Sequence, residues 1–452
     1  MKTFALKTFV CALIVLVWGG APLRAEINIQ EITTPGGISA WLVEEPSIPI
    51  VALELRFKGG GSLDAPGKRG ATNLMTGLLE EGTGDMDARA FARATETLAA
   101  SFDYDTYDDT IAVSAKFLTD TQQEAMALFR SSIIEPAFTQ VALDRVRAQV
   151  MSGLASDETD PNKIAGRTFD GMAFGDHPYA TSIDGTRESV AALTRADIVA
   201  AHKAAFARDR VYVSAVGDIS AEELATLLDT LLGDLPATGA PLVGKAEFLM
   251  QGGLTVVPFD TPQSVVLFGH AGLDRHDDDF LAAYVLNEIF GGSGLTSRLM
   301  DEVREKRGLA YGVYSYLVPK DNAAMMLGQV ASANNRVADT IEVVRAEWAK
   351  MAAEGVTAEE LEAAKTYLTG AYPLRFDGNG PIANILVGMQ LDDLGTDYVV
   401  TRNEEIEALT LEEVNRVARK LLQPDALHFV VVGQPEGLET ALTTDPKADA
   451  AH

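Results

Sequence analysis

Residues 193–217 read LTRADIVAAHKAAFARDRVYVSAVG, and residues 409–433 read LTLEEVNRVARKLLQPDALHFVVVG. In both stretches a Leu-Thr pair opens a helix-like pattern, and a run rich in β-branched residues follows and ends in glycine. The two threonines and the two glycines fall at the same places in the two stretches. A helix and a strand in shared register predict duplicated domains of about 200 residues each.

The beginnings of the two halves agree more loosely. Residues 50–57 and 264–269 are strand-like runs, and each leads towards an amphipathic helix. A mixture of strands and helices in each half predicts an α+β fold of two homologous domains, each with a mostly antiparallel sheet backed by helices. The predicted boundaries are an N-terminal domain at 26–235, a linker at 236–244, a C-terminal domain at 245–440 and a frayed tail at 441–452.

The first 25 residues have the pattern of a secretory signal peptide. Lys2 and Lys7 precede an apolar run at 8–18, and small residues lead to a cleavage point after Ala25. The only cysteine, Cys11, lies inside this segment, so the mature protein is expected to have neither a disulfide nor a thiolate metal site. We therefore expect a periplasmic or secreted protein, with an uncleaved anchor as the alternative.

Composition and net charge indicate a globular protein that is poorly suited to binding nucleic acid. Of 452 residues, 47% are hydrophobic and 23% are charged, which is a globular balance. The formal net charge of −28 disfavours nucleic acid as a partner, because an acidic surface repels phosphates. Solubility accounts for such a charge, and a preference for basic substrates stays open.

Common catalytic motifs are missing from the sequence. No two histidines stand three or four residues apart, so no helix face presents a histidine pair to a metal ion. We find no Gly-rich phosphate loop after a strand, no Gly-x-Ser-x-Gly and no catalytic cysteine in the mature chain.

A glycine cluster, FGGSG at residues 290–294, leads into a helix. The backbone N–H groups of such a loop can approach a peptide closely, which makes it a candidate substrate-binding segment. A flexible hinge between domains is an equally good interpretation, and the two are compatible. The candidate residues are Gly291, Gly292, Ser293 and Gly294.

A second segment, REKRGLAY, places Arg304 and Tyr311 on either side of Gly308. If a helix ends near Gly308, Tyr311 begins the strand at 311–317, and both side chains can point into one cleft. Arginine offers a fixed fork of donors to a peptide carbonyl, and a tyrosine hydroxyl can donate to an oxyanion. Taken alone, the pair also fits a surface arginine and a half-buried tyrosine.

Residues 70–83, GATNLMTGLLEEGT, have the frame of a helix that carries an inverted zinc motif, His-x-x-Glu-His. This segment is accompanied by HPY at 177–179, IDGT at 183–186, the SRL and REKRGLAY segments of the second half, and the repeated Leu-Thr and Val-Gly ends. Together these segments resemble the pitrilysin/insulinase family of zinc peptidases. The resemblance covers nearly the whole mature chain in the family's order.

The resemblance implies that this chain lacks the side chains that bind zinc in active members. In active members the motif supplies two zinc-binding histidines and a water-activating glutamate. The corresponding positions here are Asn73 and Gly77 for the histidines and Thr76 for the glutamate. Residues 149–156, where a further zinc-binding glutamate would fall, contain no carboxylate, and Glu80 and Glu81 one helical turn further on would make a poor site. We expect no metal in this chain.

The resemblance also implies a division of labour. Smaller bacterial members are often two different chains that enclose a chamber for unfolded peptides, one with the zinc motif and one with an arginine–tyrosine pair. Arg304 and Tyr311 match that pair, so the chain resembles the subunit without zinc. It would complete the active site of a zinc-bearing partner in a periplasmic heterodimer. A catalytically inactive envelope scaffold or peptide-binding protein is the alternative, and an independent metallopeptidase would need an unrecognised zinc site.

Overall fold

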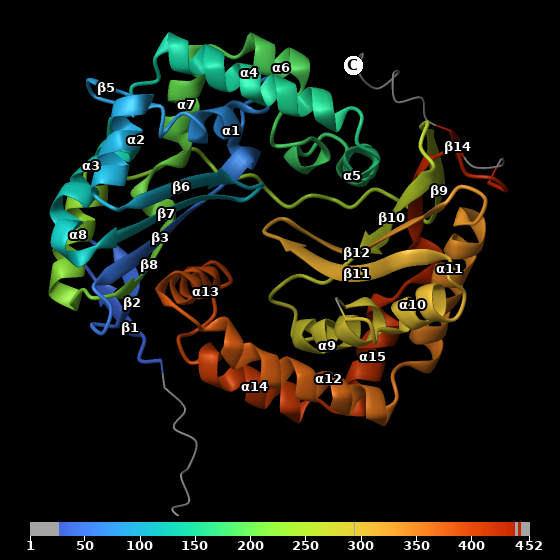
Figure 1. Ribbon diagram of the computed structural model, residues 1–452. Helices are drawn as coiled ribbons and strands as arrows, with labels where there is room; N and C mark the ends of the chain where they lie inside the picture. Colours follow the sequence, from blue (N-terminus) through green and yellow to red (C-terminus); the bar gives the residue numbers. More distant parts are fainter. Residues whose placement is uncertain (1–26, 293, 439–441, 444–452) are drawn as a thin grey trace, which may run out of the picture.

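The computed structural model describes residues 27–292, 294–438 and 442–443, and the predicted signal peptide lies outside them (Figure 1). The first half contains β1 (Gln30–Thr33), β2 (Ser39–Glu44), β3 (Ile50–Lys58), α1 (Ala71–Thr76), β4 (Gly82–Thr83), β5 (Met86–Asp87), α2 (Ala88–Thr97), β6 (Ser101–Thr106), β7 (Thr110–Leu118), α3 (Gln122–Ile134), α4 (Gln140–Asp157), α5 (Pro161–Phe174), α6 (Arg187–Ala192), α7 (Arg195–Ala205), β8 (Val211–Gly217) and α8 (Ala221–Leu232).

The second half follows the same plan. It contains β9 (Gly253–Pro258), β10 (Gln263–Ala271), α9 (Phe280–Gly291), α10 (Arg298–Met300), β11 (Ala310–Lys320), β12 (Ala323–Ala333), α11 (Val337–Glu354), α12 (Ala358–Ala371), α13 (Asn379–Leu391), α14 (Tyr398–Ala408), α15 (Leu411–Leu421), β13 (His428–Gly433) and β14 (Leu442–Thr443). The matched stretches of sequence form α7 and β8 in one half and α15 and β13 in the other, as predicted.

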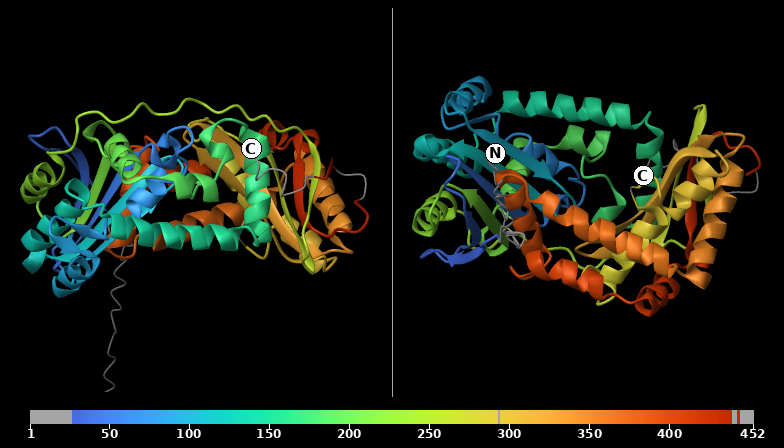
Figure 2. Two further views of the ribbon diagram at one scale, coloured as in Figure 1. Left: turned by 90° about the horizontal axis from the view of Figure 1, so that it is seen from above. Right: turned by 60° about the horizontal axis from the view of Figure 1, so that its bottom comes forward.

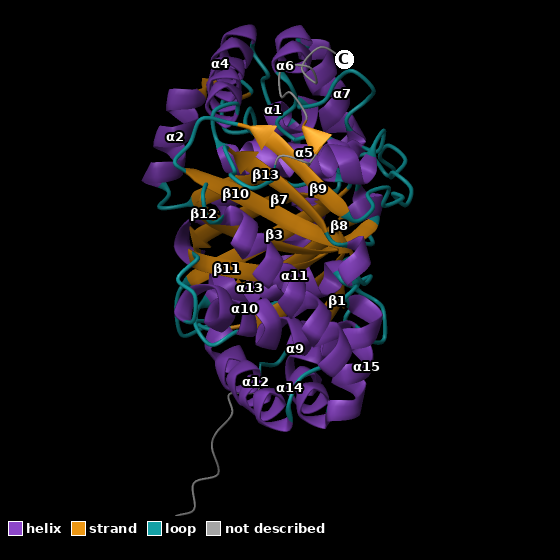
Figure 3. Ribbon diagram, turned by 90° about the vertical axis from the view of Figure 1, so that its right-hand side faces the viewer, coloured by secondary structure: helices purple, strands orange, loops and turns teal. Residues whose placement is uncertain are grey.

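The two large sheets share the topology of five strands and differ in the sixth, because β1 is antiparallel to β2 whereas β14 is parallel to β9. Their strand orders are β1-β2-β8-β3-β7-β6 and β14-β9-β13-β10-β12-β11. In both sheets the pair next to the outer edge strand is parallel, β2 with β8 and β9 with β13, and the pairs from there to the opposite edge are antiparallel. The predicted class of two homologous α+β domains is confirmed. In Figure 3 the strands occupy the middle of the molecule and the helices gather at both ends.

The predicted linker at 236–244 lies within a longer segment that has no helix or strand, and two residues of the predicted tail, 442–443, form a short strand. No helix or strand forms between Leu232 and Gly253, and this segment crosses from one half to the other along the surface (Figure 2). Backbone bonds tie it to both sides, including Ala240 N–H to Ala204 O at 2.9 Å. Within the predicted tail, residues 442–443 pair with β9, because that strand would otherwise be an open sheet edge. No helix in the described part of the chain combines the length and apolar character that a bilayer crossing requires.

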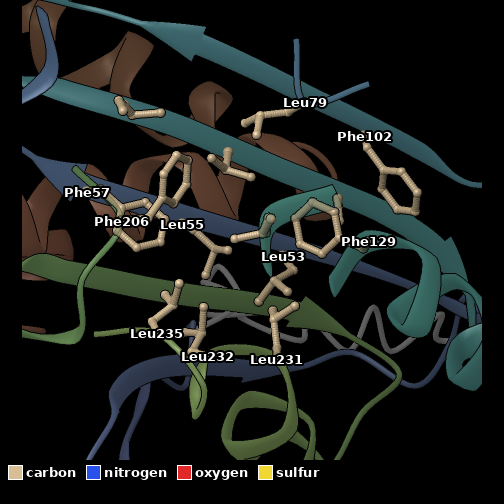
Figure 4. Packing of buried hydrophobic residues seen from close by; sticks show 14 of the residues in the cluster. Leu53, Leu55, Phe57, Leu79, Phe102, Phe129, Phe206, Leu231, Leu232 and Leu235 are labelled. Carbon is tan, nitrogen blue, oxygen red and sulfur yellow. The ribbon is translucent and has the colours of Figure 1, made fainter. Parts of the chain in front are cut away.

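Each sheet sends apolar side chains to both of its faces. In the first half, Leu53, Leu55 and Phe57 of β3 enter a core with Phe102 and Phe129 (Figure 4). The intervening Ala52 joins a different cluster on the opposite face. In the second half, alternate residues of β10 and β13 likewise divide between two cores. This period of two is what a strand buried on both faces shows.

The second face of each sheet is covered by a helix from the other half. Helix α5 from the first half packs Ile164, Phe169 and Phe174 against the second sheet. Helix α13 from the second half packs Ala383 and Leu386 against the first sheet. Both helices lie between the two sheets in Figure 1. The halves therefore exchange one helix each.

Hydrogen bonds fix the exchanged helix α13 to the first sheet. Ser214 Oγ donates to Ala383 O at 2.6 Å, and Gln390 Nε2 donates to Val213 O at 2.8 Å. The β6–β7 and β11–β12 turns also meet, with the Asp321 N–H donating to Asp109 Oδ2 at 3.1 Å and an ion pair between Lys320 and Asp108. Apolar and polar contacts together make the two halves one unit.

The exchange predicts that damage to α13 destabilises both halves. Leu386 is fully buried, so Leu386→Ala should lower the free energy of unfolding by about 2–5 kcal/mol. Trp41 in β2 and Trp348 in α11 report separately on the two halves, and each should be followed in a variant that lacks the other. We expect denaturant midpoints from both probes to shift together. Leu374→Ala, at a position 78% exposed, is the matched control and should change little. A shift confined to one probe would show that the halves unfold independently.

Candidate functional site

The segment with the frame of the zinc motif forms a helix of only one and a half turns. Gly70 enters α1 with a φ of 95°, and Asp64 accepts hydrogen bonds from the N–H groups of Gly70 and Thr72, both at 2.8 Å. The helix ends at Thr76 and Gly77 follows it as the C-cap, because glycine is a poor residue for continuing a helix. The expected longer helix is therefore wrong, and residues 77–80 form a turn.

The three motif positions have structural partners. Asn73 Nδ2 donates to Asp184 Oδ1 at 3.0 Å, which ties α1 to the IDGT segment. Thr76 is 2% exposed, and its hydroxyl lies 2.5 Å from that of Thr106. A Cβ placed on Gly77 would lie 3.2 Å from Val146 Cγ1 of α4, which is a tight contact. The position that corresponds to a zinc-binding histidine, Gly77, therefore packs closely against Val146 of α4.

The neighbouring carboxylates do not replace the missing ligands. Because α1 stops at Thr76, Glu80 and Glu81 are not one turn further along a continuous helix, which corrects our expectation. Burial raises the pKa of Glu80, and Glu81 pairs with Arg145. Within the described residues, no group of three or more His, Cys, Asp or Glu side chains is placed to hold a metal ion. The donor set therefore does not fit zinc.

The arginine–tyrosine segment of the second half is built as a helix-to-strand turn. Helix α10 continues into a π-helical turn, Asp301–Glu305, which carries Arg304. The chain leaves the helix through Gly308 at a φ of 57°, a conformation that suits glycine, and enters β11 at Ala310. Helix, glycine turn and strand follow the sequence prediction.

A β-bulge places Tyr311 at the surface. Ala310 pairs with Ser332 and Val313 pairs with Val330, so β11 has one extra residue at this point. Bulges re-aim side chains and occur beside active sites. Gly312 lets the Tyr314 side chain lie close to the bulge, because a Cβ there would be 2.9 Å from Tyr314 Oη.

The structure brings Arg304 and Tyr311 together. The Arg304 guanidinium lies 4.9 Å from the centre of the Tyr311 ring, a cation–π contact, and its Nε is 3.2 Å from Glu305 Oε1. Tyr311 is 85% exposed, and it lines an open pocket of about 700 Å³ between β11 and β12. Arg304 stands over the ring rather than in the lining of this pocket. The tyrosine is therefore exposed rather than half-buried.

Sequence reasoning missed Arg336. Its guanidinium donates to the carbonyl oxygens of Gly308 at 3.2 Å and Arg307 at 3.1 Å, so it fastens the turn that joins Arg304 to Tyr311. It also lines the Tyr311 pocket. An arginine some 30 residues along the chain gives no local signal of this contact, which depends on the position of α11.

The residues of the glycine cluster at 291–294 have different surroundings in the structure. Gly291 is the last residue of α9 and is buried, and a Cβ there would lie 2.2 Å from Ser315 Oγ of β11. Gly292 is also buried, against Glu288. Gly291 thus serves the packing of α9 on β11, and Gly292 leaves room for Glu288 of its own helix. Ser293 lies outside the described residues, and a Cβ on Gly294 would be in ordinary contact with Thr296, 3.5 Å from its Oγ1.

The two candidate sites lie in different halves. Helix α1 packs mainly on α7 and β6, whereas α10 packs on α9 and β11 (Figure 1). Among the described residues, the motif segment at 70–83 and the Arg304–Tyr311 pair therefore do not form one site. Chemically, the second site offers a guanidinium and a phenol hydroxyl, two donors that suit a peptide carbonyl and an oxyanion.

Comparison with known proteins identifies the family. The model for insulinase (peptidase family M16) matches residues 40–187, and the model described as the peptidase M16 inactive domain matches residues 192–368. Among solved structures, a peptidase M16 inactive domain from Pseudomonas fluorescens has a TM-score of 0.84 and 29% identity, covering 92% of this chain and 99% of that one. A protease from Helicobacter pylori has the same fold, with a TM-score of 0.80 at 16% identity over 90% of this chain and 99% of that one.

Curated relatives carry two kinds of name. A non-peptidase homolog, YmxG, from Helicobacter pylori is 27% identical over 94% of this chain and 98% of its own length. An uncharacterized zinc protease from Mycobacterium leprae is 27% identical over 87% of this chain and 89% of its own. The matched models, the shared fold and the emptied motif agree: this chain belongs to the insulinase family, peptidase family M16, as a homologue without the residues of the inverted zinc motif.

Proposed function

We propose that this chain is the zinc-free subunit of a two-chain peptidase in the periplasm, reached by cleavage of the signal peptide at residues 1–25. The observation that carries the proposal is the contact of Arg304 with an exposed Tyr311 on a fastened turn. The chain keeps a site that binds peptide and stabilises charge, and its own motif segment has no ligands for zinc.

Each chain contributes different groups in this proposal. A homologous partner with an intact His-x-x-Glu-His motif holds zinc, which supplies an activated water when bound. Arg304 holds the backbone of an unfolded peptide substrate, and the Tyr311 hydroxyl donates to the oxyanion that develops on the scissile carbonyl. The glycine segment at 291–294 admits or clamps substrate, with Gly291 itself committed to packing against Ser315.

A second candidate function is a peptide-binding or scaffold protein of the envelope without hydrolysis. The name of the Helicobacter pylori relative, a non-peptidase homolog, favours it. A scaffold has no use for an oxyanion donor, so the exposed Tyr311 hydroxyl argues for the peptidase subunit.

Isolation of the native chain separates these functions. The chain should be purified from periplasm under mild conditions, and the accompanying proteins identified by mass spectrometry. We expect a near-equimolar second chain of similar size that carries His-x-x-Glu-His. Isolation of the chain alone, or with envelope proteins that have no zinc motif, would favour the scaffold.

Loss of the tyrosine hydroxyl should slow the complex. Because removal of one oxyanion donor costs about 10²–10³ in turnover, Tyr311→Phe should lower kcat of the two-chain complex by that factor with assembly unchanged. Peptide hydrolysis and size-exclusion chromatography measure the two properties. Tyr367→Phe, which removes another exposed tyrosine hydroxyl, is the control. Wild-type turnover in Tyr311→Phe would rule out the assigned role.

Restoring the motif should not create a zinc enzyme. In N73H/T76E/G77H, the new glutamate replaces a buried threonine and the new histidine meets Val146, so we expect a loss of roughly 2–4 kcal/mol in stability. Val141→Glu, which adds a carboxylate at an exposed position of α4, is the control. Thermal unfolding with and without zinc is the measurement. A zinc-dependent rise in Tm with stoichiometric binding would show that only the ligands had been missing.

A further inference from the structure

A second pocket adjoins the Tyr311 pocket. Its volume is about 580 Å³, and Leu309 and Arg336 line both pockets. Its other side is one face of α11, formed by Asp339, Glu342, Val343, Ala346 and Glu347. The two pockets are therefore neighbours along one surface, and a peptide lying over Tyr311 passes the acidic face of α11.

Glu347 is the unusual member of this lining. It is 8% exposed, although it carries a carboxylate. Among the described residues, no cation lies within ion-pair distance of Glu347 and no donor hydrogen-bonds to its side chain. Burial raises its pKa. Lys350, Arg298 and Arg307 lower this pKa from further away, but burial outweighs them. The carboxylate therefore lacks a direct partner and can accept one that arrives from outside.

The charges around the pocket favour a cation. Arg307 lines it but is already paired with Glu302. Arg336 is committed to the two carbonyl oxygens of the turn. The pocket also has three carboxylates: Glu347, and Asp339 and Glu342 at its exposed rim. None of the three has an ion-pair partner among the described residues. The net charge of −28 would draw basic peptides towards this surface.

The cation that fits is a side chain rather than a metal ion. The described residues contain no cluster of carboxylates close enough to hold a metal. Carboxylates spread over two turns of a helix suit an extended group with several donors, such as a guanidinium.

We propose that the pocket formed by α11 and the Arg307–Leu309 turn is a specificity subsite that binds a basic side chain of a peptide, arginine above all, with Glu347 as its buried counter-ion. The proposal rests on the proposed function for the identity of the peptide as substrate. Binding at this subsite needs neither the partner nor hydrolysis.

The test uses the mature full-length chain and two fluorescein-labelled unfolded peptides that differ only by arginine or citrulline at one position. Citrulline keeps the shape of arginine and removes its charge. By fluorescence anisotropy, the arginine peptide should bind about tenfold more tightly, and the difference should shrink in high salt. Glu347→Gln should remove most of the preference, and Glu342→Gln should remove part of it.

Two controls separate this subsite from general acidity and from a structural role. Glu354→Gln removes an exposed charge from the end of the same helix and should keep the preference. Because Glu347 has no partner to lose, Glu347→Gln should leave Tm unchanged or raise it. Equal binding of both peptides, no binding of the arginine peptide, or equal effects of Glu354→Gln and Glu347→Gln would overturn the proposal.

The two proposals can fail separately. If no partner gives hydrolysis but the Glu347-dependent preference for arginine is present, the peptidase role fails and the subsite stands. If Tyr311→Phe slows the complex while arginine and citrulline peptides bind alike, the subsite fails and the peptidase role stands.

Discussion

The structure depends on the exchange of α5 and α13 between its two halves. Strands such as β13 are buried along their whole length and present apolar side chains to both faces. The helices of each half cover one face only. Leaving the other face in water would expose Val430 and Val432 in one sheet and Ala52 and Val216 in the other. The exchange removes both faces from water at once, so the duplicated halves need each other.

The candidate site takes its rigidity from this arrangement. Strand β11, which carries Tyr311, is an edge strand of its sheet. Its neighbour β12 contacts helices of the second half on one face and α5 from the first half on the other. Gln329 of β12 donates to Asn162 of α5 at 2.7 Å. Arg336 fastens the turn from the other side. An oxyanion donor must be preorganised, and here an exposed side chain stands on a backbone held from two directions.

Local patterns in the sequence predicted the elements and the duplication, because capping threonines, alternating strands and terminal glycines act over a few residues. The Thr194 and Thr410 capping boxes are examples. The same patterns predicted that Arg304 and Tyr311 flank a glycine turn; the contact between their side chains was not predicted, and Arg304 does not line the Tyr311 pocket. They did not predict the exchange of α5 and α13, because helix periodicity shows that a face is apolar without showing which sheet covers it. Arg336 and Glu347 were missed for the same reason.

The two half-sites differ in what they contribute to stability, and this difference supports the proposed division of labour. Asn73, Thr76 and Gly77 are each engaged in hydrogen bonds or close packing, so the emptied motif has become part of the scaffold. Arg304 and Tyr311 make one exposed cation–π contact, which contributes about 0.5–1 kcal/mol. A tyrosine that is 85% exposed beside an arginine adds little to folding. Glu347 goes further, because burying its charge without a partner opposes folding. Residues that the fold does not need, gathered along one surface, are best explained by a ligand that binds there.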